Sequence, residues 1–291
     1  MGVRLIAGRA GSGKTHWCQA RICDAFRQAP ADGPRLIMLV PEQAALQVER
    51  GLIAMLAGGG DPGSVPGRQA ARAPDLVGTS SARGSVVAAL GRCEVLSFRR
   101  LAHRILNETV GPMPVVLTPI GRQMALRRLI QRHRKDLREF AKVAERGTFV
   151  AAIARGIAEL LQESVSIEQL EAAAQSADQE GDPSAPRLHD SALVYRAYLY
   201  FLGSQRVDPE GVLDLARGRL ASAPWLSGAS VWIDGFAGLT QQQVRMIVAL
   251  AEQAAQVHVA LLLDPQRGRA KELNEAPDDF SLFARTERTW F

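Results

Sequence analysis

The sequence has only three cysteines and no hydrophobic run long enough to cross a membrane. Cys18, Cys23 and Cys93 are odd in number and lack the CxxC spacing of zinc sites, so we expect free thiols in a reducing cytoplasm. The longest apolar stretches, 36–40 and 257–263, are far shorter than the roughly 18 residues that a membrane-spanning helix needs. These absences exclude a disulfide-stapled scaffold and predict no contact with the membrane interior.

Several catalytic and targeting signatures are also missing. The five histidines form neither an HExxH motif nor a pair at helical spacing, and no GxSxG elbow is present. A short apolar run after Arg4 replaces the longer core of a signal peptide, and Ile6 stands where a myristoylation motif needs Ser or Thr. We expect neither a metal centre built from histidines nor secretion.

The composition is that of an ordinary globular protein, with 47% hydrophobic and 22% charged residues among 291. Lysine and arginine outnumber aspartate and glutamate by 35 to 30, and only four of the 35 are lysines. A net charge of +5 permits nucleic-acid binding without demonstrating it. A genome that favours arginine codons explains the excess equally well.

The order of apolar and turn segments predicts an α/β fold with a parallel sheet. An apolar run at 3–7, a glycine-rich turn at 8–13, a helical pattern at 14–26 and a second apolar run at 35–40 form a βαβ unit. Further strands are expected at 94–98, 231–233 and 257–263, and helices at 42–56, 98–106 and 241–255. The segment 118–220 is helical in pattern and contains no convincing strand.

These segments predict one α/β domain interrupted by helices. We expect residues 1–115 to form the first part of the core, 116–222 a helical insertion, and 223–291 the second part. Within the first part, residues 57–92 are rich in Gly, Pro, Ser and Arg, which predicts a flexible insertion. An RNA-binding tail is the alternative for that segment. The large apolar residues at 280–291 suggest a chain that continues further.

One motif indicates nucleotide binding. Residues 8–15 match GxxxxGK[ST] between a predicted strand and a predicted helix, although a chance glycine turn is the alternative. In such a P-loop, main-chain N–H groups surround phosphates, the lysine reaches the β- and γ-phosphates, and the hydroxyl binds Mg²⁺. The nucleotide-binding candidates are Gly8, Arg9, Ala10, Gly11, Ser12, Gly13, Lys14 and Thr15.

A P-loop requires an acid at the end of another strand, and Asp234 follows the apolar run 231–233. We expect Thr15 and Asp234 to hold Mg²⁺, although a turn-initiating role is the alternative for Asp234. Active helicase motors carry a glutamate at the next position to polarise the attacking water. Here that position is Gly235, so the site is expected to bind ATP better than to cleave it.

The motifs together resemble the N-terminal part of the B subunit of the bacterial AddAB-type helicase/deoxyribonuclease. The resemblance is carried by the P-loop, by the segment Leu39 to Ala44, by Val95 to Ala102, and by Ile233 to Gln242. It implies a superfamily 1 helicase-like core with a helical insertion, in a complex that repairs double-strand breaks by homologous recombination. It also implies binding of DNA, a motor/nuclease A subunit as partner, and an iron–sulfur nuclease outside this segment.

The resemblance also implies DNA contacts at Pro41, Glu42, Gln43, Ser97 and Phe98. Phe98 would stack on a base, or else pack beneath its own helix, and Ser97 would bond a phosphate. An arginine-rich helix from Arg122 to Arg138 is expected to be a solvated face, with DNA contact as the alternative. The competing functions are a small P-loop kinase and a structural partner that binds no nucleotide.

Overall fold

The computed structural model describes residues 2–29, 33–57 and 92–263. The insertion expected at 57–92 therefore lies outside the described residues, apart from its two ends. The chain divides into two compact units, and each is described by itself. Unit 1 comprises residues 1–109, 217–239 and 243–291, and unit 2 comprises residues 110–216 and 240–242.

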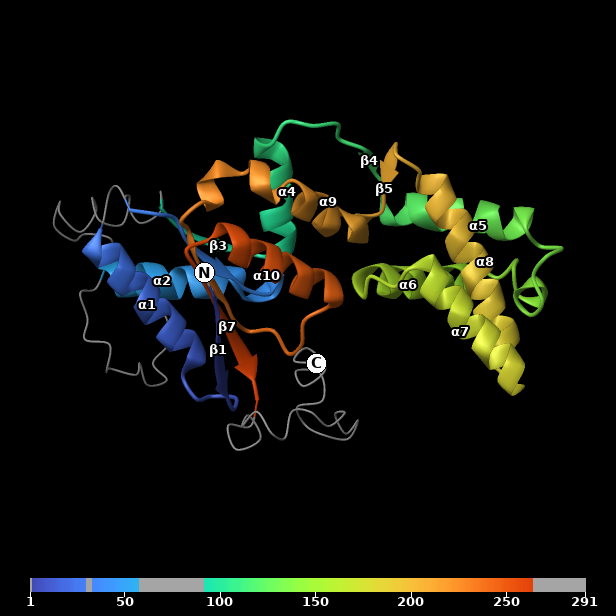
Figure 1. Cartoon of the computed structure of the whole chain (residues 1–291), viewed down its shortest axis with the longest axis horizontal. Coiled ribbons are helices and arrows are strands. Elements are labelled where there is room, and N and C mark those ends of the chain that lie inside the picture. Colours follow the sequence, from blue (N-terminus) through green and yellow to red (C-terminus); the bar gives the residue numbers. More distant parts are fainter. Residues whose placement is uncertain (1, 30–32, 58–91, 264–291) are drawn as a thin grey trace. The chain divides into compact units, whose positions relative to one another are not determined.

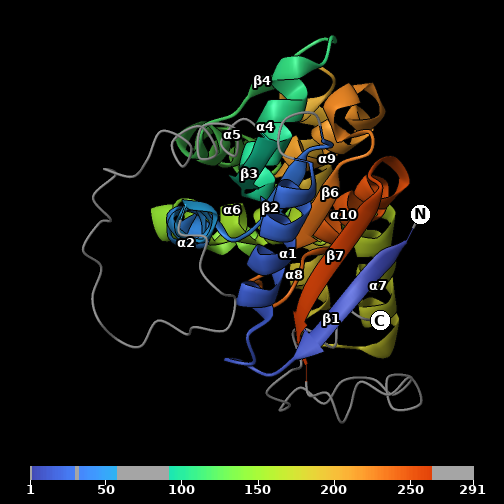
Figure 2. The same cartoon turned by 90° about the vertical axis from the view of Figure 1, so that its left-hand side faces the viewer.

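Unit 1 is built on a parallel sheet whose strand order is β1-β7-β6-β2-β3. Figure 2 labels all five strands, and Figure 1 labels β1, β3 and β7. The strands are β1 (Val3–Gly8), β2 (Leu36–Leu39), β3 (Cys93–Leu96), β6 (Ser230–Ile233) and β7 (Gln256–Leu262). Every adjacent pair is parallel. The α/β class with a parallel sheet, predicted from the sequence, is confirmed.

Helices cover both faces of this sheet because parallel strands are joined by crossovers. Those with most of their residues in unit 1 are α1 (Lys14–Gln28), α2 (Ala45–Ala57), α4 (Phe98–Glu108) and α10 (Gln241–Gln253). Short 3₁₀ turns occur at Glu42–Ala44, Leu220–Ser222 and Pro224–Leu226. One core joins α1 and α2 to the sheet: Ile22 and Phe26 of α1, one helical turn apart, pack with Leu52 of α2 and Met38 of β2.

Unit 2 is predominantly helical. Its helices are α5 (Pro119–Arg132), α6 (Gly147–Gln162), α7 (Ile167–Glu180), α8 (Ala185–Leu202) and most of α9 (Val212–Gly218), with 3₁₀ turns at Phe140–Lys142 and Pro209–Gly211. Its core is built around Leu126, Ile130 and Tyr198, all fully buried. The prediction of no strand between 118 and 220 was wrong, because β4 (Val115–Val116) pairs with β5 (Arg206–Val207). A two-residue strand is too short to leave a periodic pattern.

The arginine-rich segment differs from the predicted solvated helix in two respects. Helix α5 ends at Arg132, so Arg138 lies beyond it. Arg122 is buried, because it shares a helical face with Leu126 and Ile130, and its Nη2 donates to Asp208 Oδ1 at 2.8 Å. Tyr198 Oη donates to the other oxygen of Asp208, and burial together with this bond raises the pKa of the phenol. Arg122 therefore serves the core of unit 2.

In the described part of the chain, no helix is both long enough and apolar enough to cross a lipid bilayer.

Candidate functional site

The glycine-rich loop lies between β1 and α1, where the sequence predicted it. Gly11 and Gly13 have φ angles of +75° and +84°, a left-handed conformation that glycine adopts without steric cost. A Cβ at Gly8 would lie 2.6 Å from Ser12 Oγ, so the serine side chain would have to rotate away. Glycine at positions 11 and 13 lets the chain turn sharply from the strand into the helix.

Lys14 is the first residue of α1, and its side chain folds back over the loop. Its Nζ donates to the main-chain oxygens of Gly8 and Arg9, both at 2.8 Å, and lies 3.5 Å from Ser12 Oγ. The ammonium group is thus held above the loop by neutral oxygens. Such acceptors can be exchanged for an anionic acceptor, because the attraction between opposite charges then adds to the hydrogen bond.

Thr15 and Asp234 meet although 219 residues separate them. Thr15 Oγ1 donates to Asp234 Oδ2 at 2.5 Å. Asp234 follows β6, is 4% exposed, and donates its main-chain N–H to Leu39 O of β2 at 3.0 Å. The carboxyl ends of parallel strands lie at one edge of the sheet, which is where ligands bind in open α/β sheets. A buried carboxylate and a hydroxyl are therefore fixed side by side beneath the loop.

The charge of Asp234 reaches the neighbouring helix. Burial raises the pKa of the Cys18 thiol to about 12, and the Asp234 carboxylate adds to the shift. Cys18 is completely buried on α1, three residues after Thr15. The thiol is consequently protonated at neutral pH and serves as a packing residue.

Gly235 is held against the end of β2. Its φ is +85°, and a Cβ would lie 3.2 Å from Pro41 Cδ. The parallel register of β2 and β6, which sets Leu39 opposite Ile233, brings these two positions together. No side chain can be added at Gly235 without backbone strain and a close contact.

The five residues expected to touch DNA lie at the ends of β2 and β3. Pro41 precedes the 3₁₀ turn that carries Glu42 and Gln43, and Ser97 is the N-cap of α4, accepting from Arg100 N at 3.2 Å. Ser97 Oγ donates to Glu42 Oε2, and Arg99 Nη2 lies 3.7 Å from Glu42 Oε1. The Glu42 carboxylate is therefore engaged by a hydroxyl and a guanidinium from the next strand-helix junction.

Phe98 lies inside unit 1. It is 5% exposed, and its ring packs against that of Phe236 with centroids 5.4 Å apart. In this conformation the ring is not open to a base, which agrees with the alternative of packing beneath its own helix. Gln43 is exposed beside Glu42.

The structure brings Thr15 to Asp234, and Pro41 to Gly235, at the carboxyl edge of the sheet. The bond between Ser97 and Glu42 was missed by the sequence reasoning, because 55 residues separate them and no local pattern pairs them. Among the described residues, no group of three or more His, Cys, Asp or Glu side chains could hold a metal ion.

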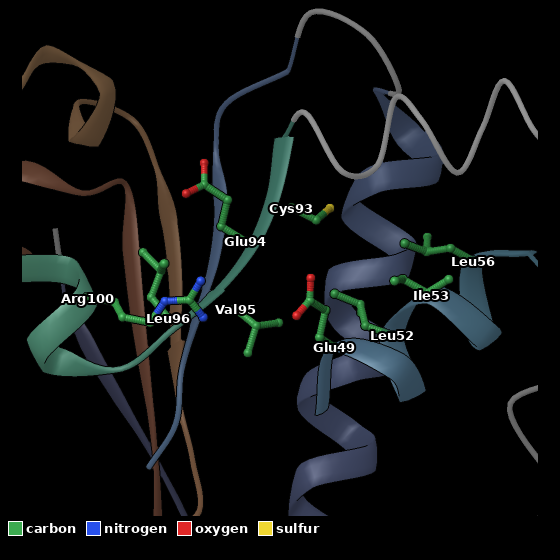
Figure 3. Close-up of a pocket in the computed structure, with 9 residues that line it drawn as sticks. All are labelled: Glu49, Leu52, Ile53, Leu56, Cys93, Glu94, Val95, Leu96 and Arg100. Atoms are coloured by element: carbon green, nitrogen blue, oxygen red, sulfur yellow. The ribbon is translucent and has the colours of Figure 1, made fainter. Parts of the chain in front are cut away.

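A pocket of about 290 Å³ lies beside β3, at the edge of the sheet opposite β1. Figure 3 shows its apolar lining of Leu52, Ile53 and Leu56 from α2 together with Val95 from β3. It is therefore separate from the glycine-rich loop, which follows β1.

Comparison with known proteins decides the family. A family model described as "ADDB, N-terminal" matches residues 5–61 and 77–291. The chain belongs to the AddB N-terminal family. The resemblance drawn from the sequence motifs is thereby confirmed.

Curated relatives of this AddB-family chain are named as the B subunit of an ATP-dependent helicase/deoxyribonuclease. The protein from Desulforudis audaxviator (strain MP104C) is 38% identical over 94% of this chain, and that from Moorella thermoacetica (strain ATCC 39073 / JCM 9320) is 37% identical over 91%. The protein from Heliobacterium modesticaldum (strain ATCC 51547 / Ice1) is 35% identical over 99%. In each case the chain spans only 21% of the relative's length.

Proposed function

We propose that this chain is the ATP- and DNA-binding, helicase-like part of the B subunit of a bacterial helicase/deoxyribonuclease complex. In this proposal residues 1–115 and 223–291 are a P-loop NTPase core built on the sheet of unit 1, and residues 116–222 are a helical insertion. The observation that carries the proposal is the bond between Thr15 and Asp234, which joins the P-loop to the acid of a second strand.

The loop residues fit a nucleoside triphosphate. Residues 8–13 would offer main-chain N–H groups to the phosphates, since Gly11 and Gly13 hold the turn that directs such groups inward. Lys14 would leave the carbonyl oxygens of Gly8 and Arg9 for the β- and γ-phosphates, a stronger acceptor for its charge. Loss of Lys14 should therefore weaken ATP binding more than loss of any exposed lysine.

Thr15 and Asp234 would hold Mg²⁺. The fit follows from their chemistry: a hydroxyl and a buried carboxylate lie 2.5 Å apart at the helix start, and oxygen ligands are those that Mg²⁺ prefers. The ion, when bound, neutralises phosphate charge. Thr15 and Asp234 would position the ion, and Lys14 would orient the phosphates beside it.

Hydrolysis should be slow, because the position after Asp234 is Gly235. Orienting and polarising water is a main contribution of phosphoryl-transfer enzymes, and Gly235 has no side chain with which to do so. Binding and hydrolysis are thus separable in this chain. We assign it no catalytic residue.

DNA is proposed to contact Pro41, Glu42 and Gln43 at the end of β2. Ser97 and Phe98, each 5% exposed, would support them from within unit 1. The relatives' name supports an assembly with a motor/nuclease A subunit, and the role in double-strand break repair by homologous recombination follows from the family resemblance. Three free buried cysteines are typical of the reducing cytoplasm, which we propose as the compartment.

Calorimetric titration of the chain with ATP and Mg²⁺ tests the nucleotide site. We expect binding by the wild type and a loss of at least about tenfold in affinity for Lys14→Ala, since a charge-assisted hydrogen bond contributes about 1.5–3 kcal/mol. Lys135→Ala, which removes the same charge from an exposed position of unit 2, is the matched control and should bind as the wild type does. Equal affinity in the wild type and Lys14→Ala would refute the P-loop assignment.

A further inference from the structure

Helix α5 of unit 2 presents a row of exposed arginines. Arg127, Arg128 and Arg132 lie in its second half, and all three are exposed. The helix, PIGRQMALRRLIQR, contains no acidic residue. Within the residues that the structure describes, none of the three guanidinium groups has a hydrogen-bond or ion-pair partner. The second half of α5 therefore carries three positive charges that form no ion pair among the described residues.

Three other exposed arginines of unit 2 differ from these because they form ion pairs. Arg134 lies 2.6 Å from Glu145, Arg187 lies 3.0 Å from Glu139, and Arg196 pairs with Glu171. Each of these charges is balanced by a carboxylate within the unit. Arg146 and Arg155, at the start and in the middle of α6, are exposed and have no ion pair among the described residues. The gathering of three such arginines on one helix without an acidic residue distinguishes α5 from a surface on which charges of both signs are mixed for solubility.

The core holds this row in place. Leu126 and Ile130 of α5 are completely buried, and Thr118 caps the start of the helix by accepting from Gly121 N at 3.0 Å. Arg128 and Arg132 are one helical turn apart, which corresponds to a rise of about 6 Å. That rise spans about two phosphates of one strand, since each strand of a DNA duplex carries a charge every ~3.4 Å along its axis.

We infer that the face of α5 formed by Arg127, Arg128 and Arg132 binds the phosphate backbone of duplex DNA. This inference rests on the proposed function and adds to it a contact on unit 2, apart from the residues proposed at the end of β2. Arginine suits the role because its planar guanidinium group binds phosphate oxygens bidentately.

A duplex fits this face better than a single strand does. Single-strand sites combine positive charge with aromatic side chains on which bases stack, and α5 has no aromatic residue. The first half of the helix exposes Ile120 and Met124, 71% and 68% exposed, so the DNA contact is confined to the second half. The alternative occupant of this face is an acidic protein segment, which would cover Ile120 and Met124 as well. The salt dependence of DNA binding distinguishes the two.

The test is the salt dependence of binding of the whole chain to a fluorescently labelled blunt DNA duplex of random sequence. Each arginine–phosphate contact contributes about 0.9 to the slope of log affinity against log salt concentration. The triple variant Arg127→Gln/Arg128→Gln/Arg132→Gln should therefore lower the slope by up to about 2.7. Its affinity near physiological salt should fall at least about tenfold, and replacement of the same three residues by lysine should restore the slope.

The matched control is Arg134→Gln/Arg187→Gln/Arg196→Gln. It lowers the net charge by the same amount, also in unit 2, but from arginines already engaged by carboxylates. It should keep the wild-type slope. The same measurement is repeated with a labelled single strand of thymidines. For this single strand, the slope of log affinity against log salt concentration should be the same for the α5 variant and the wild type.

Glutamine is a good helix former, and circular dichroism checks that α5 is intact. If the triple variant does not fold, the single variants Arg128→Gln and Arg132→Gln replace it. Each should lower the slope of log affinity against log salt concentration by about 0.9. Equal slopes for the wild type and the α5 variant would overturn the inference, while ATP binding and its loss in Lys14→Ala would still support the proposed function. Wild-type chain that binds no duplex overturns this inference and the proposed DNA binding together. If the α5 variant no longer co-purifies with a co-expressed A subunit while its duplex binding is unchanged, this face binds a protein and the inference is overturned.

Discussion

Replacing Gly235 by alanine should destabilise unit 1, although the residue is exposed and carries no side chain. Its φ of +85° costs an L-residue about 1–2 kcal/mol, and the new Cβ would lie 3.2 Å from Pro41 Cδ. One kcal/mol shifts the melting temperature of a domain of this size by roughly 2–4 °C, so we expect a fall of about 2–8 °C. Scanning calorimetry of the purified chain measures it.

Two other glycines of the chain separate strain from contact. Gly228 has a φ of +74°, but a Cβ there would meet nothing within 4 Å, so Gly228→Ala should cost the strain alone. Gly156 lies within α6 and is equally unobstructed, so Gly156→Ala should stabilise its helix by roughly 0.5–1 kcal/mol. The reasoning is refuted if Gly235→Ala melts at or above the wild-type temperature. A fall no larger than that of Gly228→Ala would refute the contact with Pro41.

The same geometry governs any attempt to restore a catalytic acid. Gly235→Glu places the carboxylate where active helicase motors carry one, but it carries the strain of the left-handed backbone and the close contact with Pro41. We expect it to melt at least as low as Gly235→Ala. Its ATPase activity must therefore be interpreted together with its melting temperature. A variant as stable as the wild type that hydrolyses ATP rapidly would contradict the strain and the close contact described at Gly235.

Three further predictions concern buried groups. His258, stacked on Trp232 at 5.5 Å, has its pKa lowered by burial and by the charges of Arg4 and Arg21. The unfolded chain therefore takes up this proton near pH ~6.5 while the folded chain resists it, so stability falls as the pH drops below that value. Melting curves of His258→Phe should be less pH-dependent than wild type, and an unchanged dependence would argue against this role. Burial also raises the pKa of all three thiols, to about 12, 11 and 11 for Cys18, Cys23 and Cys93. Iodoacetamide should alkylate them slowly at neutral pH until urea unfolds the chain, and rapid alkylation of the native chain would contradict their burial. Finally, Arg122→Ala leaves the Asp208 carboxylate buried without its counter-charge, which should cost about 3–5 kcal/mol in denaturant unfolding, against less than about 0.5 kcal/mol for exposed Arg127→Ala.

The local features of this protein follow from its sequence alone. The turn from β1 into α1 arises from an apolar run, glycines and a helical pattern within some 25 residues, and local steric rules are enough to specify it. The position of Asp234 after a buried strand was predicted on the same basis. The role of Thr15 and Asp234 in holding Mg²⁺ stays a prediction. The two strands that precede these residues, β1 and β6, lie where the apolar pattern predicted them. The motifs in their order also indicated the family, which the comparisons confirmed.

Which distant residues meet depends on the tertiary fold. The sheet order β1-β7-β6-β2-β3 places strands beside one another that are far apart in the chain, and no local pattern encodes that order. It alone sets Pro41 against Gly235 and Ser97 against Glu42. Burial of Arg122 was likewise missed, because a charged residue enters a core only when a partner such as Asp208 is already there to meet it, and that partner lies 86 residues away.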